Sequence, residues 1–94
     1  LAAGAQAHQS GQRGEAERYY QQALELSPKN VRALTSFGLL LGQMRDYVRA
    51  EELLKTAIRL SSRTPDAYAN LAMLLNEQLE YVLHNVAKVI NVAG

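Results

Sequence analysis

The stretch that decides the fold is residues 34–58, which read LTSFGLLLGQMRDYVRAEELLKTAI. Its apolar residues recur every three or four positions, as they do on one face of an α-helix. They form two series, Leu34, Phe37, Leu41 and Met44 and then Tyr47, Ala50, Leu54, Ala57 and Ile58. Because Arg45-Asp46 interrupts the pattern between them, the stretch predicts two amphipathic helices joined by a short turn.

The same pattern recurs on both sides of this stretch with a period of 34 residues. Gly4, Gly38 and Ala72 form one series at this spacing. Others are Ala3, Phe37 and Leu71; Ala7, Leu41 and Leu75; and the pairs Ala16 and Ala50, Tyr20 and Leu54, Ala23 and Ala57, and Leu26 and Leu60. A fixed period of this length is typical of stacked helical repeats.

Glycine, proline and polar residues mark the helix ends. Gly11 and Gly14 separate the first pair of helices, and Pro28 ends the first unit. Pro65, after the potential cap Thr64, suits a first helical turn. We therefore expect an all-α fold of antiparallel helix-turn-helix pairs, with helices at about 1–10, 14–26, 31–44, 47–60, 65–78 and 81–91.

Small residues and large residues are expected to pack at different helix contacts. Gly4, Gly38 and Ala72 lie where the two helices of a pair meet, and a larger side chain there would hold the helices apart. The layer between adjacent pairs is expected to contain the large residues Phe37, Leu41, Leu54, Tyr68, Leu71 and Leu75.

Length and composition exclude several classes of protein. Ninety-four residues allow one small domain, and 48% apolar with 20% charged residues is ordinary for a folded chain. A net charge of +1 provides no electrostatic footprint for nucleic acid. The longest uncharged apolar run, residues 37–41, is far shorter than the roughly 20 residues that span a bilayer. The chain starts Leu1-Ala2-Ala3-Gly4, without an initiating Met or a basic leader, so we expect a piece of a longer protein.

No group of residues predicts catalysis. The chain has no cysteine, and its two histidines, His8 and His84, have no carboxylate pair or second histidine at metal-ligand spacing. Its glycines follow the packing pattern rather than a phosphate-binding loop. We therefore expect no enzyme, no cofactor and no metal site. The absence of cysteine and of N-x-[ST] sites agrees with a cytoplasmic protein.

The middle unit, Leu34-x-x-Phe37-Gly38-x-x-Leu41 followed by Ala50-x-x-x-Leu54-x-x-Ala57, resembles the tetratricopeptide repeat (TPR) family. The first unit adds Ala16, Tyr20, Ala23 and Pro28 of the same signature. The resemblance covers residues 1–81, about two and a half to three repeats. It implies helical pairs stacked as a short right-handed α-solenoid.

The resemblance also implies a division of the chain. We expect a single domain over residues 1–94, with repeat 1 at about 1–30, repeat 2 at 31–64, and repeat 3 at 65–81. An atypical helix follows at 82–94, since His84, Lys88 and Asn91 stand where the family has Ala, a large apolar residue and Ala. That helix could be a cap, an altered reading of the natural repeat, or a segment exchanged between molecules.

In this family the first helices of the repeats line a concave wall that binds other proteins. The resemblance maps that wall onto nine residues, Arg32, Thr35, Ser36, Leu39, Gln43, Asp66, Asn70, Met73 and Glu77. Leu39 and Met73 would receive an apolar anchor, while Arg32 and Asn70 would hold a peptide backbone or a carboxylate. The clamp by which some relatives hold the carboxylate of heat-shock chaperones is not expected, because its positions carry Leu1, Ala5, Ser36, Asp66 and Asn70.

The expected function is a non-enzymatic scaffold that binds a peptide or helix of a partner protein, with no nucleic acid and no membrane span. Two alternatives stay open at this point. The chain could be the substrate-recognition or assembly segment of a larger enzyme such as a transferase. It could also form homo-oligomers through its apolar C-terminal helix, residues 82–94.

Overall fold

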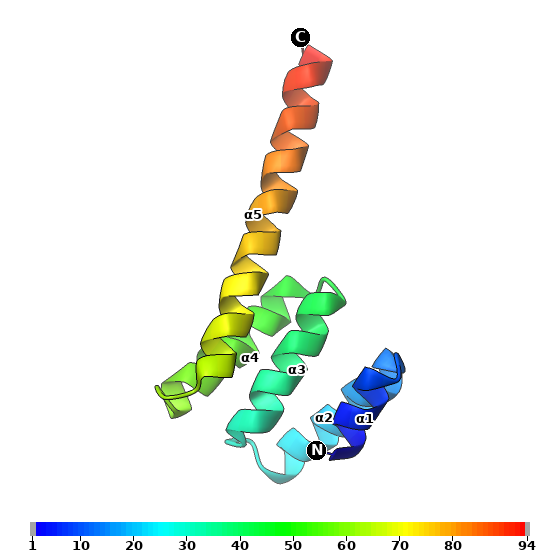
Figure 1. The fold of residues 1–94 in the computed structure, drawn as a ribbon, viewed down its shortest axis with the longest axis vertical. Coiled ribbons are helices and arrows are strands. Elements are labelled where there is room, and N and C mark those ends of the chain that lie inside the picture. The colour runs from blue at the N-terminus through cyan, green and yellow to red at the C-terminus, as the bar shows by residue number, and fades with distance from the viewer. Residues whose placement is uncertain (1, 94) are drawn as a thin grey trace.

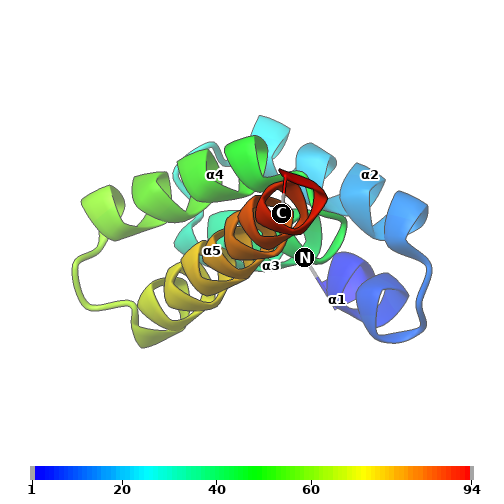
Figure 2. The ribbon, with the colours of Figure 1, turned by 90° about the horizontal axis from the view of Figure 1, so that it is seen from above.

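A computed structural model describes residues 2–93, which form five helices and no strand (Figure 1). The helices are α1 (Ala2–Gln9), α2 (Arg13–Leu26), α3 (Val31–Gln43), α4 (Tyr47–Leu60) and α5 (Pro65–Ala93). Consecutive helices pack against each other, and α3 also contacts α5. Figure 2 shows α2 and α4 on one side of the molecule and α1, α3 and α5 on the other. The all-α helical-repeat fold is therefore confirmed.

The turns inside the two complete pairs share one backbone feature. Gly11 and Arg45, which are 34 residues apart, both have a positive φ, 79° and 63°. This left-handed conformation ends α1 and α3 and reverses the chain. In the second pair the Asp46 side chain then caps α4 by accepting a hydrogen bond from Arg49 N at 3.4 Å. Asn30 caps α3 in the same way, through Ala33 N at 3.1 Å.

Gly4 and Gly38 let the two helices of each complete pair approach each other, as expected, whereas Ala72 is exposed and has no second helix packed on it in the described structure. A Cβ atom at Gly38 would lie 2.7 Å from Leu54 Cγ, and one at Gly4 would lie 2.8 Å from Tyr20 Cε1. Between the first two pairs, the Tyr20 and Phe37 rings stack with their centroids 5.9 Å apart. Close packing of this kind joins repeats 1 and 2 in one apolar core.

The expected break between residues 78 and 81 is wrong, because α5 continues through it to Ala93. Leu79 occupies the position of Gly11 and Arg45, and Glu80 that of the cap Asp46. A branched apolar side chain disfavours the left-handed conformation, and Glu is a poor N-cap. Neither turn signal is present, so the helix goes on.

The expectation for Tyr68 and Leu75 is wrong as well. They correspond to the buried Leu34 and Leu41, yet their exposed fractions are 46% and 45%. No second helix of repeat 3 folds back over this face of α5 within residues 2–93. Leu74 is buried instead, at 3%, and contributes to the same core as Leu40.

The division into repeats and a terminal helix at 82–94 stays a prediction. Its two end residues, Leu1 and Gly94, lie outside the described part of the chain.

Candidate partner-binding surface

The nine residues expected on the concave wall lie on two neighbouring helices that contact each other. Five are on α3 and four on α5. Most keep some accessible surface, and Met73 is 52% exposed. Thr35 is the exception, at 7%, because its Oγ1 turns back to donate a hydrogen bond to Val31 O at 2.8 Å.

Five of the nine meet in a depression between the two helices. Leu39, Gln43, Asn70, Met73 and Glu77 line it, together with Gly38, Gly42 and Leu74. Here the helices approach closely, since a Cβ atom at Gly42 would lie 3.2 Å from Leu74 Cδ1. The depression is small and open to solvent, with a volume of about 20 Å³. We call it the α3–α5 depression.

A second depression extends this surface toward repeat 1. Ser36, Leu39 and Gln43 line one side of it, and the other side consists of Ala5, His8, Gln9, Gly11, Arg13 and Tyr20. His8 Nε2 donates a hydrogen bond to Gln43 Oε1 across it. This α1–α3 depression has a volume of about 450 Å³, and it shares Leu39 and Gln43 with the first.

The contribution of α1 was missed by the sequence reasoning, although a signal was present. Ala5, Leu39 and Met73 are 34 residues apart, as are Gln9, Gln43 and Glu77. The wall therefore repeats in register with the packing positions. By contrast, Arg32, Thr35 and Asp66 line neither depression.

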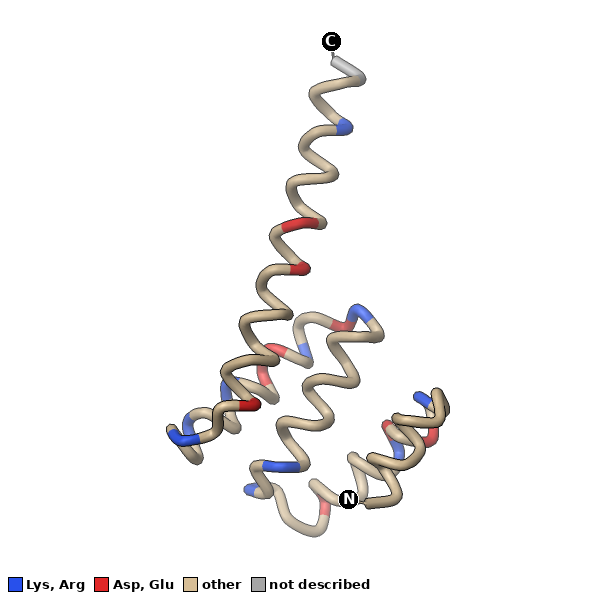
Figure 3. Tube along the Cα trace, viewed as in Figure 1, with Lys and Arg blue, Asp and Glu red and all other residues tan. Residues whose placement is uncertain are grey.

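Charge is sparse on this surface. Arg32 is the only charged residue of α3, and Figure 3 shows most of that helix free of charged residues. Glu77 is the one Asp, Glu, Lys or Arg among the residues that line the α3–α5 depression, and Arg13 is the one in the other, which also holds His8. The surface thus presents amides and apolar groups, which suit peptide groups and apolar side chains better than phosphates.

The buried side chain of Tyr20 lines the α1–α3 depression. Burial raises the pKa of Tyr20, and a hydrogen bond between its side chain and Ser36 partly opposes that rise. Ser36, which was expected on the wall, therefore lies beside Tyr20 of α2, and both line this depression.

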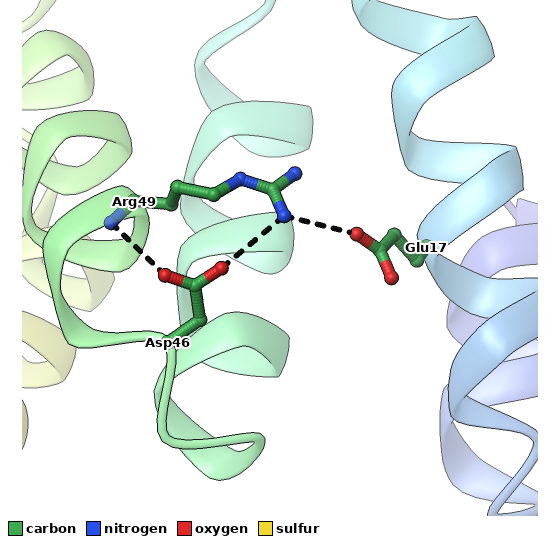
Figure 4. Close-up of polar contacts among 3 residues, drawn as sticks. All are labelled: Glu17, Asp46 and Arg49. Atoms are coloured by element: carbon green, nitrogen blue, oxygen red, sulfur yellow. Dashed lines mark hydrogen bonds and ion pairs between the residues drawn. The ribbon is translucent and has the colours of Figure 1, made fainter.

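The two shortest ion pairs of the described residues lie away from both depressions. Figure 4 shows Arg49 Nη1 between Glu17 Oε1 at 3.1 Å and Asp46 Oδ2 at 3.2 Å. The Arg49 guanidinium also lies 5.5 Å from the Phe37 ring centroid. The ion pair between Arg49 and Glu17 links α4 to α2 across the repeat boundary. Because the groups are partly exposed, its contribution to stability is modest, about 1 kcal/mol or less per pair.

Neither a metal-binding cluster nor a membrane-spanning helix is found in the part of the chain that the structure describes. Across residues 2–93 no cluster of three His, Cys, Asp or Glu side chains could hold a metal ion. None of the described helices is both long and apolar enough to cross a membrane.

Comparison with known families decides the class of repeat. One tetratricopeptide repeat family model matches residues 19–52, and a second matches residues 6–30. This chain belongs to the tetratricopeptide repeat family. Both matched stretches end before α5, where the TPR pattern departs from its usual second helix.

Two curated proteins are similar to this TPR chain. Tetratricopeptide repeat protein 7B of Homo sapiens is 32% identical over 68 residues, which are 72% of this chain and 8% of that protein. Its Mus musculus counterpart is 32% identical over 60 residues, 64% of this chain and 7% of that protein. The chain thus spans less than a tenth of the length of these relatives.

TPR repeats generally mediate protein–protein interaction, and TPR proteins are generally non-enzymatic scaffolds. The all-helical repeat and its surface of amides and apolar groups agree with that role. The chain is therefore a helical TPR repeat of the interaction-scaffold type.

Proposed function

We propose that this chain is itself a non-enzymatic interaction module, which binds a peptide or helix of a partner protein along the α1–α3 and α3–α5 depressions. The observation that carries the proposal is the meeting of Leu39, Gln43, Asn70, Met73 and Glu77 from two successive repeats. Cofactors, metals and nucleic acid have no part in it.

Leu39 and Met73 would provide the apolar contacts for such a segment. They occupy the same position in adjacent first helices, whose axes lie about 8–10 Å apart in packed helix pairs. A segment in the polyproline II conformation has three residues per turn and advances about 3.1 Å per residue, so apolar side chains three residues apart lie on one face of it and would reach both. We therefore expect the partner segment to carry two apolar residues at that spacing.

Amide side chains would hold the backbone of the segment. Gln43 and Asn70 can each donate to a carbonyl and accept from an N–H group. Arg32 and Asp66 lie outside the depressions and would contact the ends of a longer segment, while the buried Thr35 offers the least surface.

A pull-down from cell lysate with mass-spectrometric readout tests the proposal. It compares the chain with an Arg32→Ala/Leu39→Ser/Asn70→Ala/Met73→Ser variant. The matched control is Arg18→Ala/Leu26→Ser/Gln22→Ala/Val48→Ser, which changes exposed residues of α2 and α4. Circular dichroism first establishes that both variants remain helical.

We expect partners that are retained by the control and lost from the first variant. A partner list that is the same for all three proteins would contradict the proposal, as would partners lost equally from both variants.

A further inference from the structure

One face of α5 is apolar along most of the helix and has no helix packed over it in the described structure. It carries Tyr68, Leu75, Leu79, Val82, Val86 and Val89, flanked by Leu83 and Ile90. These side chains are between 45% and 68% exposed. Figure 1 shows that the C-terminal part of α5 projects beyond the other helices. An apolar surface of this extent marks an interaction site.

The spacing of this face is that of a coiled-coil seam. From Tyr68 the positions run 68, 72, 75, 79, 82, 86 and 89, in alternating steps of four and three. Such a 3.5-residue period keeps one stripe facing a partner helix over its whole length. Ala72 is the one small residue in it. We call residues 68–89 at these positions the α5 seam.

The charged residues of α5 all lie off the seam, while Arg45 and Glu51 of the neighbouring turn and α4 line a depression beside Val82. The two flanking rows of the seam, residues 69, 76, 83 and 90 and residues 71, 78 and 85, hold only uncharged side chains. Asp66, Glu77, Glu80, His84 and Lys88 all fall at the remaining positions of the seven-residue period. A second helix of the same sequence would therefore meet no like-charge repulsion along the contact.

Repeat 2 shows what normally covers the first part of this face. There α4 packs on α3 through Ala50, Leu54 and Ala57, which are at most 1% exposed. The residues 34 positions later are His84, Lys88 and Asn91, whose polar side chains would have to be buried in the same contact. Burying an unpaired ammonium or amide is costly, so residues 81–93 cannot cover their own α5 in this way.

Residues 81–93 are apolar on the side opposite His84, Lys88 and Asn91. That side can pack against another apolar helix face. Val82, Val86 and Val89 lie on the seam together with Leu75 and Leu79. We propose that two copies of this chain pair antiparallel through the α5 seam, so that residues 82–89 of each copy cover residues 72–79 of the other.

The two-fold axis of this dimer lies between residues 80 and 81. In that register Leu79 of one copy faces Val82 of the second copy, Leu75 faces Val86, and Ala72 faces Val89. Each contact occurs twice, as closed two-fold symmetry requires. The second copy thereby replaces the missing second helix of repeat 3.

The seam is distinct from the proposed binding surface. Asn70, Met73 and Glu77 lie off the seam and its flanking rows, and they line the depression against α3. Dimerisation and partner binding can therefore succeed or fail independently of each other.

Sedimentation equilibrium of the 94-residue chain tests the pairing. We expect the mass to rise with concentration to twice that of one chain. A Leu79→Asp/Val86→Asp variant should stay monomeric, whereas Leu26→Asp/Met73→Asp, with the same added charge at exposed apolar sites off the seam, should still dimerise. A chain that is monomeric at every concentration would overturn the proposal, and so would equal loss of dimer in both variants.

Disulfide trapping tests the orientation without introducing charge. The chain has no native cysteine, so Leu75→Cys and Val86→Cys variants each carry a single thiol. When the two are mixed and mildly oxidised, we expect the mixed disulfide to form in large excess over either homodimer. Mainly homodisulfides would mean parallel pairing, and no disulfide would mean no pairing; either result overturns the antiparallel dimer.

Discussion

The absence of a side chain at Gly38 sets the distance between α3 and α4. Since an added Cβ would lie 2.7 Å from Leu54 Cγ, Gly38→Ala must displace the Leu54 side chain or the helix. We expect the free energy of unfolding to fall by about 1–3 kcal/mol, the usual cost of overpacking. Urea denaturation measures it.

Gly14 provides the matched control in α2. A Cβ there would meet nothing within 4 Å. Gly14→Ala should leave the free energy of unfolding unchanged or raise it by up to about 1 kcal/mol, because Ala favours helix. Equal destabilisation by both substitutions would show that Gly38 is not a contact point.

Tyr20 makes stability depend on pH at the alkaline end. Burial raises its pKa above the usual 10.0, so the folded state holds the proton after the unfolded state has begun to lose it. The Tyr20 contribution is therefore fully present below pH 10 and is lost as pH rises through the folded-state pKa. Urea denaturation at a series of alkaline pH values should show a steeper loss for the native chain than for Tyr20→Phe. Parallel curves would contradict this assignment.

At the scale of the helix, the sequence predicted four of the helices and both complete turns well. The 34-residue period identified Gly38, Ala50 and Leu54 as contacts because close packing restricts those positions to certain sizes. It failed in repeat 3, where the first half of the pattern is present. The period led to a turn at 78–81 that Leu79 and Glu80 do not support.

The sequence likewise predicted only part of the candidate surface. Residues of α3 and α5 were found from the family pattern, but the part that α1 plays depends on how repeat 1 lies against repeat 2. That arrangement follows from the contacts between Tyr20, Phe37 and Ser36, which no single-helix pattern specifies.

Restoring the missing signals in repeat 3 should bend α5 into a helical pair. The variant Leu79→Gly/Glu80→Asp/His84→Ala/Lys88→Leu/Asn91→Ala copies the left-handed glycine of repeat 1 and the cap and packing residues of repeat 2. Folding back would bury Tyr68 and Leu75, so we expect a gain of at least about 2 kcal/mol in unfolding free energy. Thermal melting measures the gain, and sedimentation should show a monomer. A lower melting temperature than that of the native chain would argue against this explanation of the helix.

Across the whole molecule, the projecting end of α5 dominates the shape. The radius of gyration is 15.3 Å, with principal extents of 54 × 30 × 18 Å. A compact chain of this length would have a radius of gyration of about 12 Å. The core is accordingly concentrated in α1 to α4 and the start of α5, with Leu54 at its centre at 1% exposure.

Leu54→Ala should weaken the whole domain. It removes a fully buried side chain that lies against Gly38, and the cavity left behind adds to the lost burial. We expect a cost of about 2–5 kcal/mol, measured by thermal melting. A shift of less than a degree would show that Leu54 is not part of a cooperative core.

The continuity of α5 decides whether the seam exists, and a distance between its two ends tests it most directly. Spin labels at Asp66→Cys and Asn91→Cys, both off the seam, allow that distance to be measured by pulsed electron resonance in a chain without native cysteine. Dilution with unlabelled chain removes distances between copies. A single helix predicts about 37 Å, from a rise of 1.5 Å per residue. A distance near the roughly 10 Å that separates paired helices would show that repeat 3 folds back, and would contradict the open seam.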